Sequence, residues 1–299
     1  MSSLSEGSIS SKQRFASTVD YYIKFRPSYP KDVLSILGDS YGLVSNSTIA
    51  DIGSGTGIFT RLILENSSAS TVWGVEPNDS MRKSAEDYLR TAVNTQQFGH
   101  FVSINGSSES TGLPDHSVDL ITAAQAFHWF DPKIFRTEAL RILRRPGIGA
   151  NCSWIALLWN MRQTERSDFM RAYDKLLRDY GTDYTRVRAE NIVDEAIINF
   201  FRSDSNSNTP TSELTGSQRY PFTRLLPHLH LYRLPNPVTM DWPFLRGRLL
   251  STSYIPRAEG DPERYASMVQ RAEQVFHVHA RDGRVVFEAD TLLYVGQLA

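Results

Sequence analysis

The chain is poor in cysteine, has no excess of one charge and contains no long apolar run. Cys152 is the only cysteine in 299 residues, which excludes an internal disulfide and leaves a cysteine-based zinc site unsupported. The formal net charge of −1 gives no basic footprint for nucleic acid. No stretch is long enough to span a membrane, and residues 1–13 lack the apolar run of a signal peptide. We therefore expect a cytoplasmic protein without a nucleic-acid or membrane partner.

Residues 49–59 form the most informative segment, because a short apolar strand runs there into a glycine-rich turn and then into helix-compatible sequence. Three glycines stand at alternate positions of the turn, namely Gly53, Gly55 and Gly57. Glycine has no Cβ and accepts positive φ, so this turn can lay its amides against a ligand. Glu76 ends the next apolar strand roughly twenty residues later, where nucleotide-binding folds read ribose hydroxyls. Dinucleotide enzymes need a glycine or alanine where this chain has Ile58, so a nicotinamide oxidoreductase is disfavoured.

From residue 48 onward, strand-like and helix-like stretches alternate, which is typical of a parallel sheet with helices on both faces. Asp131 and Pro132 open one of these helices in a cap-then-proline order. Residues 229–234 and 285–295 read as strands, separated by helical sequence near 244–250 and 262–279. The pattern predicts one elaborated α/β domain.

Four blocks in this order carry a family resemblance: residues 51–57 (DIGSGTG), 75–78 (VEPN), 113–119 (LPDHSVD) and 126–130 (AFHWF). Together they resemble the class I S-adenosylmethionine-dependent methyltransferases. The chain is most similar to the small-molecule branch around trans-aconitate methyltransferase, the type 11 methyltransferase family. The match covers about residues 15–160.

The resemblance implies a Rossmann-like, mostly parallel sheet of seven strands with a final antiparallel strand pair and a helical cap insertion. We expect a disordered tail over residues 1–14, and an S-adenosylmethionine-binding core with an N-terminal lid over 15–160. A helical insertion with a flexible loop is expected over 161–222. The C-terminal part of the same domain then follows over 223–299.

S-adenosylmethionine is the cofactor that the resemblance implies, bound at the carboxyl ends of the strands. Glu76 would bind the ribose, and Asp51 would orient the turn or meet the methionine amine through water. The other expected cofactor contacts come from the turn, from later strand ends and from the lid, where Tyr29 is a further candidate. They are Gly53, Ser54, Gly55, Gly57, Pro77, Met81, Ser108, Glu109, Ala124, Gln125, Ala126, Tyr22 and Arg26.

The acceptor side is less constrained by sequence. His128 has an ordinary pKa suited to a general base, and a structural histidine is the alternative. Glu165, after the fifth strand, is a second candidate base or a glutamate that simply starts a helix. Trp129 would wall the substrate site or fill the core. Arg248 and Tyr254 would bind an anionic acceptor, because guanidinium groups match carboxylate or phosphate, and a solvated helix face is the plainer alternative.

We predict an enzyme that moves a methyl group to a small organic molecule by in-line displacement, with catalysis by positioning and water exclusion. A methyltransferase for protein or nucleic acid remains open, as does a non-catalytic S-adenosylmethionine-binding module. Two His-x-His pairs, at 228/230 and 277/279, have no accompanying cysteine or carboxylate cluster, so we expect no metal. The expected partner is a small-molecule acceptor, and the expected state is a monomer or homodimer.

Overall fold

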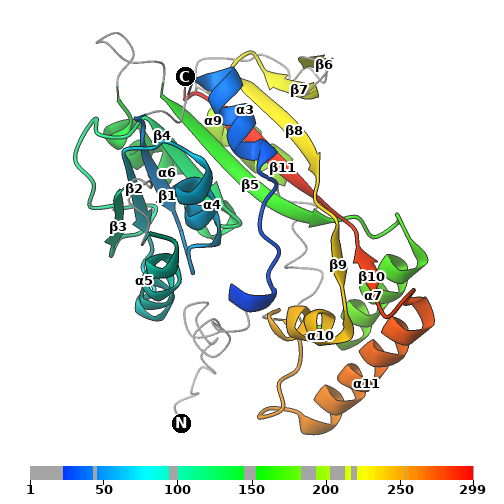
Figure 1. Ribbon diagram of the computed structural model, residues 1–299. Helices are drawn as coiled ribbons and strands as arrows, with labels where there is room; N and C mark the ends of the chain where they lie inside the picture. The colour runs from blue at the N-terminus through cyan, green and yellow to red at the C-terminus, as the bar shows by residue number, and fades with distance from the viewer. Residues whose placement is uncertain are drawn as a thin grey trace, which may run out of the picture.

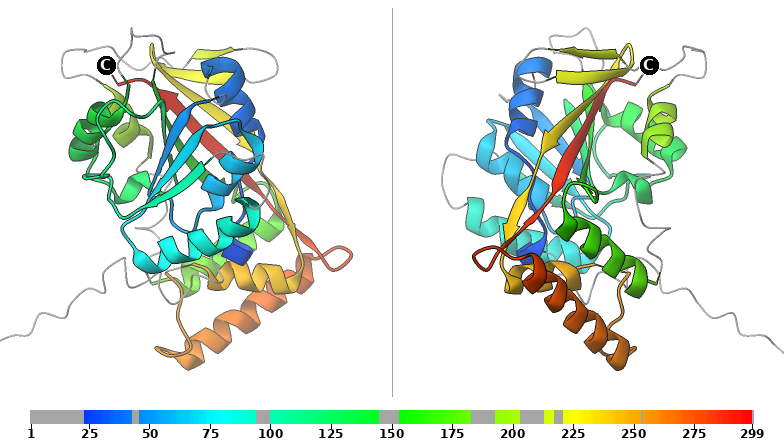
Figure 2. Two further views of the ribbon diagram at one scale, coloured as in Figure 1. Left: turned by 60° about the vertical axis from the view of Figure 1, so that its left-hand side comes forward. Right: turned by 90° about the vertical axis from the view of Figure 1, so that its right-hand side faces the viewer.

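Strands and helices alternate through the first half of the chain and build a doubly wound sheet (Figure 1). The computed structural model describes residues 23–42, 46–93, 100–144, 153–182, 193–202, 213–216, 221–252 and 254–298. Helices cover both faces of the sheet, and a second group of helices lies beyond one end of its strands (Figures 1 and 2). None of the helices in these ranges is long and apolar enough to cross a bilayer.

The first five strands are parallel and stand in the order β3-β2-β1-β4-β5. Their bounds are β1 Thr48–Ile52, β2 Thr71–Val75, β3 His100–Ile104, β4 Leu120–Ala124 and β5 Trp154–Arg162. Every residue of β1 is buried, as expected for a central strand covered on both faces. The strand order changes direction between β1 and β4, and such switch points leave a crevice at the carboxyl ends of the strands. The predicted α/β fold is confirmed.

The helices that pack on the sheet form two groups, one on each face. Their bounds are α3 Asp32–Tyr41, α4 Ile58–Asn66, α5 Asp79–Val93, α6 Pro132–Ile142 and α9 Val193–Phe201. The first three share one apolar core and the last two share another, on opposite faces. Alternate strand residues serve the two cores, because successive side chains of a strand point to opposite faces. Within β5, for example, Ile155 lies under α6 and α9, while Ala156 lies under α3 to α5.

The other half of the sheet is antiparallel and continues the order as β5-β11-β8-β7-β6. The bounds are β11 Ala289–Gly296, β8 Leu229–Pro235, β7 Pro221–Leu226 and β6 Glu213–Gly216. The predicted final pair is present, since β11 lies between β5 and β8 and is antiparallel to both. Strands β7 and β6 extend the seven expected strands to nine, because the open edge of β8 offers backbone groups for pairing.

The predicted strand over residues 285–295 is divided in two. Strand β10 (Val285–Phe287) ends before Glu288 and leaves the main sheet to pair with β9 (Val238–Met240). Strand β11 then continues in the main sheet. The division carries Phe287 away from the sheet and toward the helices beyond it.

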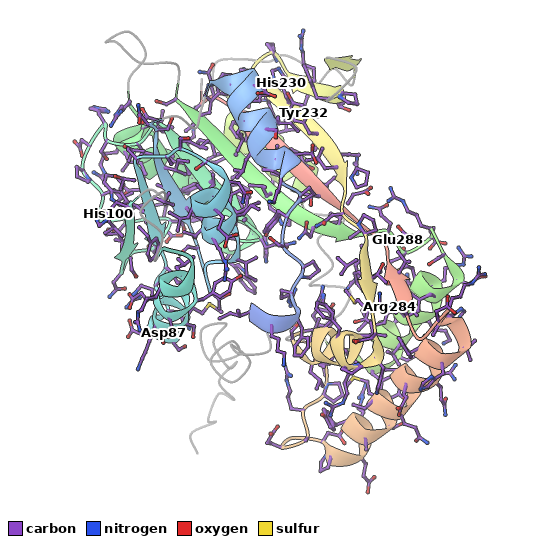
Figure 3. All side chains as sticks on the ribbon, viewed as in Figure 1. Asp87, His100, His230, Tyr232, Arg284 and Glu288 are labelled. Atoms are coloured by element: carbon purple, nitrogen blue, oxygen red, sulfur yellow. The ribbon has the colours of Figure 1, made fainter. Side chains whose placement is uncertain are left out.

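Helix α3 is also tied to the antiparallel half of the sheet. The hydroxyl of Tyr41, its last residue, lies 2.8 Å from Nδ1 of His230 and 2.9 Å from the hydroxyl of Tyr232. Both partners project from β8 beside α3 (Figure 3). The His230 ring is therefore part of a structural hydrogen-bond cluster.

The elements beyond the sheet form a smaller unit, which we call the cap. It consists of α7 (Asp168–Tyr180), α10 (Trp242–Leu250), α11 (Pro262–His279) and the β9–β10 pair, around an apolar core of its own. Side chains of Ser167, Asp241 and Asp261 cap the starts of the three helices. Of the described residues in 161–222, α7 belongs to the cap, whereas α9 packs on α6.

Candidate functional site

A cavity of about 610 Å³ opens at the carboxyl ends of β1, β2, β4 and β5, between the sheet and the cap. This volume lies within the range of small-molecule sites, roughly 300–1,000 Å³. The crevice expected at the switch in strand order is therefore a real cavity. Its walls come from the turns after the strands, from α10 and from residues near the N-terminus.

The glycine turn after β1 forms the floor of one end. Gly53 and Gly55 have φ angles of 69° and 56°, in the left-handed region that residues with a Cβ rarely adopt. A Cβ added at Gly53 would lie 2.6 Å from the Cβ of Ala126, so the close approach of the two turns also requires glycine. Gly53, Ser54 and Gly55 line the cavity.

Gly57 lies outside the cavity and has a different role from the predicted one. It precedes the first residue of α4 with a φ of 81°, so it supplies the left-handed residue that starts the helix. A Cβ added at Gly57 would lie within 3.4 Å of the side chains of Ala85 and Leu89. The expected contact of Gly57 with a cofactor is thus replaced by helix packing.

Asp51 lies beneath the turn and is only 1% exposed. Its carboxylate accepts hydrogen bonds from the hydroxyls of Thr60 at 2.6 Å and Thr122 at 2.9 Å. Burial raises the pKa of Asp51 to about 6; the two hydroxyls lower it in part, and the charge of Glu76 raises it further. A cation in the cavity would favour the charged carboxylate.

Glu76, at the end of β2, faces the cavity and fixes the glycine turn. Its Oε2 accepts from the amide of Gly55 at 3.0 Å, and its Oε1 accepts from the amide of Asn78 at 2.8 Å. Glu76 thus anchors the turn, and its carboxylate lines the cavity, where a carboxylate is suited to accept from hydroxyls of a ligand. Pro77 and Met81 add apolar surface to the same wall.

The turn after β3 places Ser108 and Glu109 on the cavity wall, as predicted. The Ser108 hydroxyl donates to Glu109 Oε1 at 2.7 Å, and the amide of Asp131 donates to the same oxygen at 3.3 Å. Burial would raise the pKa of Glu109, but these bonds and that of Ser107 outweigh it and lower the pKa. Glu109 is therefore charged at neutral pH.

Ala124, Gln125 and Ala126 follow β4 and line the cavity. Gln125 has a φ of 57°, which is rare outside glycine and is concentrated at functional sites. Two hydrogen bonds hold it there, from its amide to the carbonyl of Leu158 at 2.8 Å and from its Nε2 to the carbonyl of Asn160 at 3.2 Å. The small neighbouring side chains leave room for a ligand against the backbone.

His128 sits in the short 3-10 helix η1 (Phe127–Trp129) and lines the cavity. Its ring keeps accessible surface because that surface faces the cavity, yet the surrounding protein desolvates it and lowers its pKa to about 4. The ring is therefore neutral at pH 7, and within the described residues it makes no hydrogen bond. Trp129, 52% exposed, lies 4.9 Å from it by ring centroids.

The opposite wall carries three arginines. Arg26 comes from residues 23–30, which we call the N-terminal strap, Arg162 ends β5, and Arg248 lies on α10. Tyr254 lines the same wall and accepts from Nη1 of Arg162 at 3.0 Å. The strap is fixed at Ser28, whose carbonyl accepts from Asn236 Nδ2 at 2.9 Å.

Besides Gly57, two predicted residues are not placed at the cavity. Glu165 is exposed and does not line it, so the structure gives no support to its role as a base. Tyr22 lies outside the described residues, whereas Tyr29, also considered for the lid, lines the cavity. The other predicted side chains line it, including Arg26, Trp129, Arg248 and Tyr254.

Sequence reasoning missed part of the cap-side wall. Asn160 and Arg162 follow the buried part of β5, and the rule that ligands bind at strand ends would have found them. Phe287 and Ala289 carry no such signal, because their place depends on the break between β10 and β11.

Known proteins share both the sequence and the fold of this region. Residues 50–150 match the family described as methyltransferase domain. An uncharacterized methyltransferase of Mycobacterium tuberculosis is 32% identical over 174 residues, which are 58% of this chain and 61% of that protein. A candidate methyltransferase of Dictyostelium discoideum is 28% identical over 207 residues, 68% of this chain and 71% of that protein. The solved structure of a candidate type II methyltransferase from Anaeromyxobacter dehalogenans has a TM-score of 0.55 at 17% identity, covering 92% of this chain and 98% of that one.

The order of the strands, the antiparallel extension and the cavity at the carboxyl ends define a class I methyltransferase fold. The match of residues 50–150 to the methyltransferase-domain family agrees with the resemblance seen in the sequence. The aligned part spans 61% of the mycobacterial relative, less than two thirds of its length.

Proposed function

We propose that the protein transfers a methyl group from S-adenosylmethionine to a small organic molecule. The observation that carries the proposal is one continuous cavity with two unlike ends. The glycine turn and Glu76 form one end, and Arg248 with Tyr254 forms the other. A donor and an acceptor bound at the two ends would meet beside His128.

The residues at the sheet end fit the cofactor chemically. The glycine turn is a cradle that side chains would fill, and Glu76 presents carboxylate lone pairs suited to ribose hydroxyls. Pro77 and Met81 provide apolar surface for a base. The buried carboxylate of Asp51 favours a cationic ligand, in agreement with a sulfonium and an amine.

When bound, S-adenosylmethionine would supply an electrophilic methyl group for an electron pair of the acceptor, and S-adenosylhomocysteine would be the product that leaves. The chain has to hold the acceptor in line and keep water away. Gln125 and the flanking alanines fix the backbone at this point. A proton released by the acceptor would pass to the neutral ring of His128 or to solvent.

A small acceptor is favoured over a macromolecule by the shape and charge of the site. The cavity volume of about 610 Å³ suits a nucleoside cofactor with a compact second ligand. The net charge of −1 gives no electrostatic support to a nucleic-acid acceptor.

Calorimetry with S-adenosylmethionine and S-adenosylhomocysteine tests the donor site. The double variant Gly55→Ala, Glu76→Gln should weaken the binding of both ligands by about 100-fold, because it strains the turn and removes a charged acceptor of hydrogen bonds. The matched control is Gly283→Ala, Glu86→Gln: Gly283 also has positive φ (68°), Glu86 is exposed, and neither lines the cavity. No binding by the parent, or equal affinities in both double variants, would reject the proposal.

A further inference from the structure

Among the described residues, charge is divided between the two ends of the cavity. The carboxylates that line it are on the sheet side: Asp51 lies in β1, and Glu76 and Glu109 follow β2 and β3. The arginines that line it stand on the wall formed by the strap, the end of β5 and α10. These arginines are far apart in the sequence, so the fold has gathered three positive charges at one end.

Arg248 is the most unusual of the three. It is 7% exposed, yet within the described residues its guanidinium makes no ion pair and its Nε has no hydrogen-bond partner. The contacts of its side chain are weak: Nη1 lies 3.5 Å from the Ser251 hydroxyl, and the guanidinium carbon lies 5.5 Å from the centroid of the Phe287 ring. A buried charge without a counter-charge is unfavourable, so a ligand that brings the missing charge would bind strongly.

The neighbours of Arg248 strengthen the positive field rather than cancel it. Nη2 of Arg26 donates to the carbonyl of Ser251 at 3.0 Å, and Nη1 of Arg162 donates to the Tyr254 hydroxyl at 3.0 Å, which aims both guanidiniums at this wall. Burial, with repulsion from Arg26 and Arg162, lowers the pKa of Arg248 to about 9. Burial would raise the pKa of Tyr254, but the arginines outweigh it and lower that pKa. Arg248 is therefore charged at neutral pH.

We propose that Arg248, with Arg26 and Arg162, binds an anionic group of the methyl acceptor, a carboxylate or a phosphate. The proposal rests on the function proposed above and names the chemical class of its acceptor. Guanidinium forks match the oxygens of these groups and bind them through paired hydrogen bonds. Arg248 carries the assignment, because it is buried and its guanidinium has no counter-charge among the described residues.

Calorimetry on full-length protein saturated with S-adenosylhomocysteine tests this assignment, because the cofactor carboxylate is then already bound. The probes are malonate, inorganic phosphate and the neutral malonamide. Malonate or phosphate should bind the parent and malonamide should not, and the stronger of the two anions tells a carboxylate acceptor from a phosphate acceptor. Arg248→Gln should weaken anion binding by about tenfold or more. Arg246→Gln, on the same helix but outside the cavity, should keep the anion affinity within about twofold of the parent.

The affinity for S-adenosylhomocysteine separates this proposal from its rival. Arg248→Gln should leave that affinity within about threefold of the parent, since a site away from the cofactor is not coupled to it. Anions that bind only the cofactor-free protein, and compete with S-adenosylhomocysteine, would show that the arginines serve the cofactor carboxylate. Absence of anion binding, or equal binding by Arg248→Gln and the parent, would also overturn the proposal. Failure of S-adenosylhomocysteine itself to bind would instead contradict the proposed function.

Folding of the variant is checked by far-ultraviolet circular dichroism, and Arg162→Gln provides a second variant from a different element. If Arg248→Gln does not fold, weakened anion binding in Arg162→Gln still supports the proposal, and unchanged binding contradicts it.

Discussion

Replacing Arg248 with methionine should stabilise the protein, although the change removes contacts. Burial and the charges of Arg26 and Arg162 lower the pKa of Arg248 to about 9. This fall from an ordinary value above about 12 corresponds to a free energy on the order of 5 kcal/mol against the charged form. Methionine loses the contact with the Phe287 ring and the 3.5 Å hydrogen bond to Ser251, each on the order of 1 kcal/mol. The expected net gain is about 1–4 kcal/mol.

Urea unfolding at pH 7 without added anions measures the effect, with Arg166→Met as the contrast. Arg166 donates to both oxygens of the buried carboxylate of Asp290, at 2.8 and 2.6 Å, so its loss should destabilise by about 2 kcal/mol or more. The folded-state pKa of Arg248 lies below its unfolded value, so its penalty is full below pH 9 and declines as the pH rises through 9. The difference in free energy of unfolding between Arg248→Met and the parent should therefore decrease as the pH rises above 9. A loss of stability in Arg248→Met like that in Arg166→Met would refute the reasoning and make Arg248 a structural cation.

Four further predictions concern the donor site, the strap and the reaction. Glu76→Gln should weaken S-adenosylhomocysteine binding by about tenfold in calorimetry, because a neutral amide accepts more weakly than a carboxylate; a change under about twofold would contradict this role. The folded-state pKa of Asp51 is raised to about 6, so protonation below pH 6 stabilises the fold but removes the charge that favours a cationic ligand. The affinity for S-adenosylmethionine should therefore fall as the pH drops through 6. If the affinity of Asp51→Asn depends on pH in the same way, Asp51 is not the cause of that dependence. A Cβ at Gly247 would overlap the Phe25 ring of the strap, so Gly247→Ala should displace Arg26 and weaken malonate binding by about tenfold; unchanged malonate affinity would argue against the role of the strap in anion binding. His128→Asn should reduce turnover by about 100-fold if the ring takes the proton of the acceptor, and turnover within a few-fold of the parent would assign His128 a structural role. Because the pKa of His128 is about 4, the turnover of the parent should not depend on His128 protonation between pH 6 and 7.

Local sequence determined the sheet end of the site almost completely. The glycines, Glu76 and the residues after β3 and β4 act where their own strands end, so one strand-turn pattern fixes both their conformation and their position. The position of Gly57 before α4 was not predictable, because alternate spacing in the sequence does not distinguish a ligand cradle from a helix start. The backbone of Gln125 was not foreseeable, since its left-handed φ depends on contacts with β5 and on the carbonyl of Asn160.

The cap end of the site depends on tertiary contacts. Arg26 and Arg248 come close to Arg162 only because the strap packs on α10, with the Phe25 and Phe244 rings 5.5 Å apart. No periodic pattern links positions so distant in the chain. The sequence could suggest an anion-binding stretch around Arg248, but burial without a counter-charge is visible only in the folded structure.

The most direct test of the central claim is the transfer of an isotopically labelled methyl group from S-adenosylmethionine to a metabolite extract, followed by mass spectrometry. A small anionic molecule should gain the label, S-adenosylhomocysteine should appear in equal amount, and Glu76→Gln should slow the formation of both. Label found only in the protein or nucleic-acid fraction, or no transfer by a parent protein that binds the cofactor, would contradict a small-molecule methyltransferase.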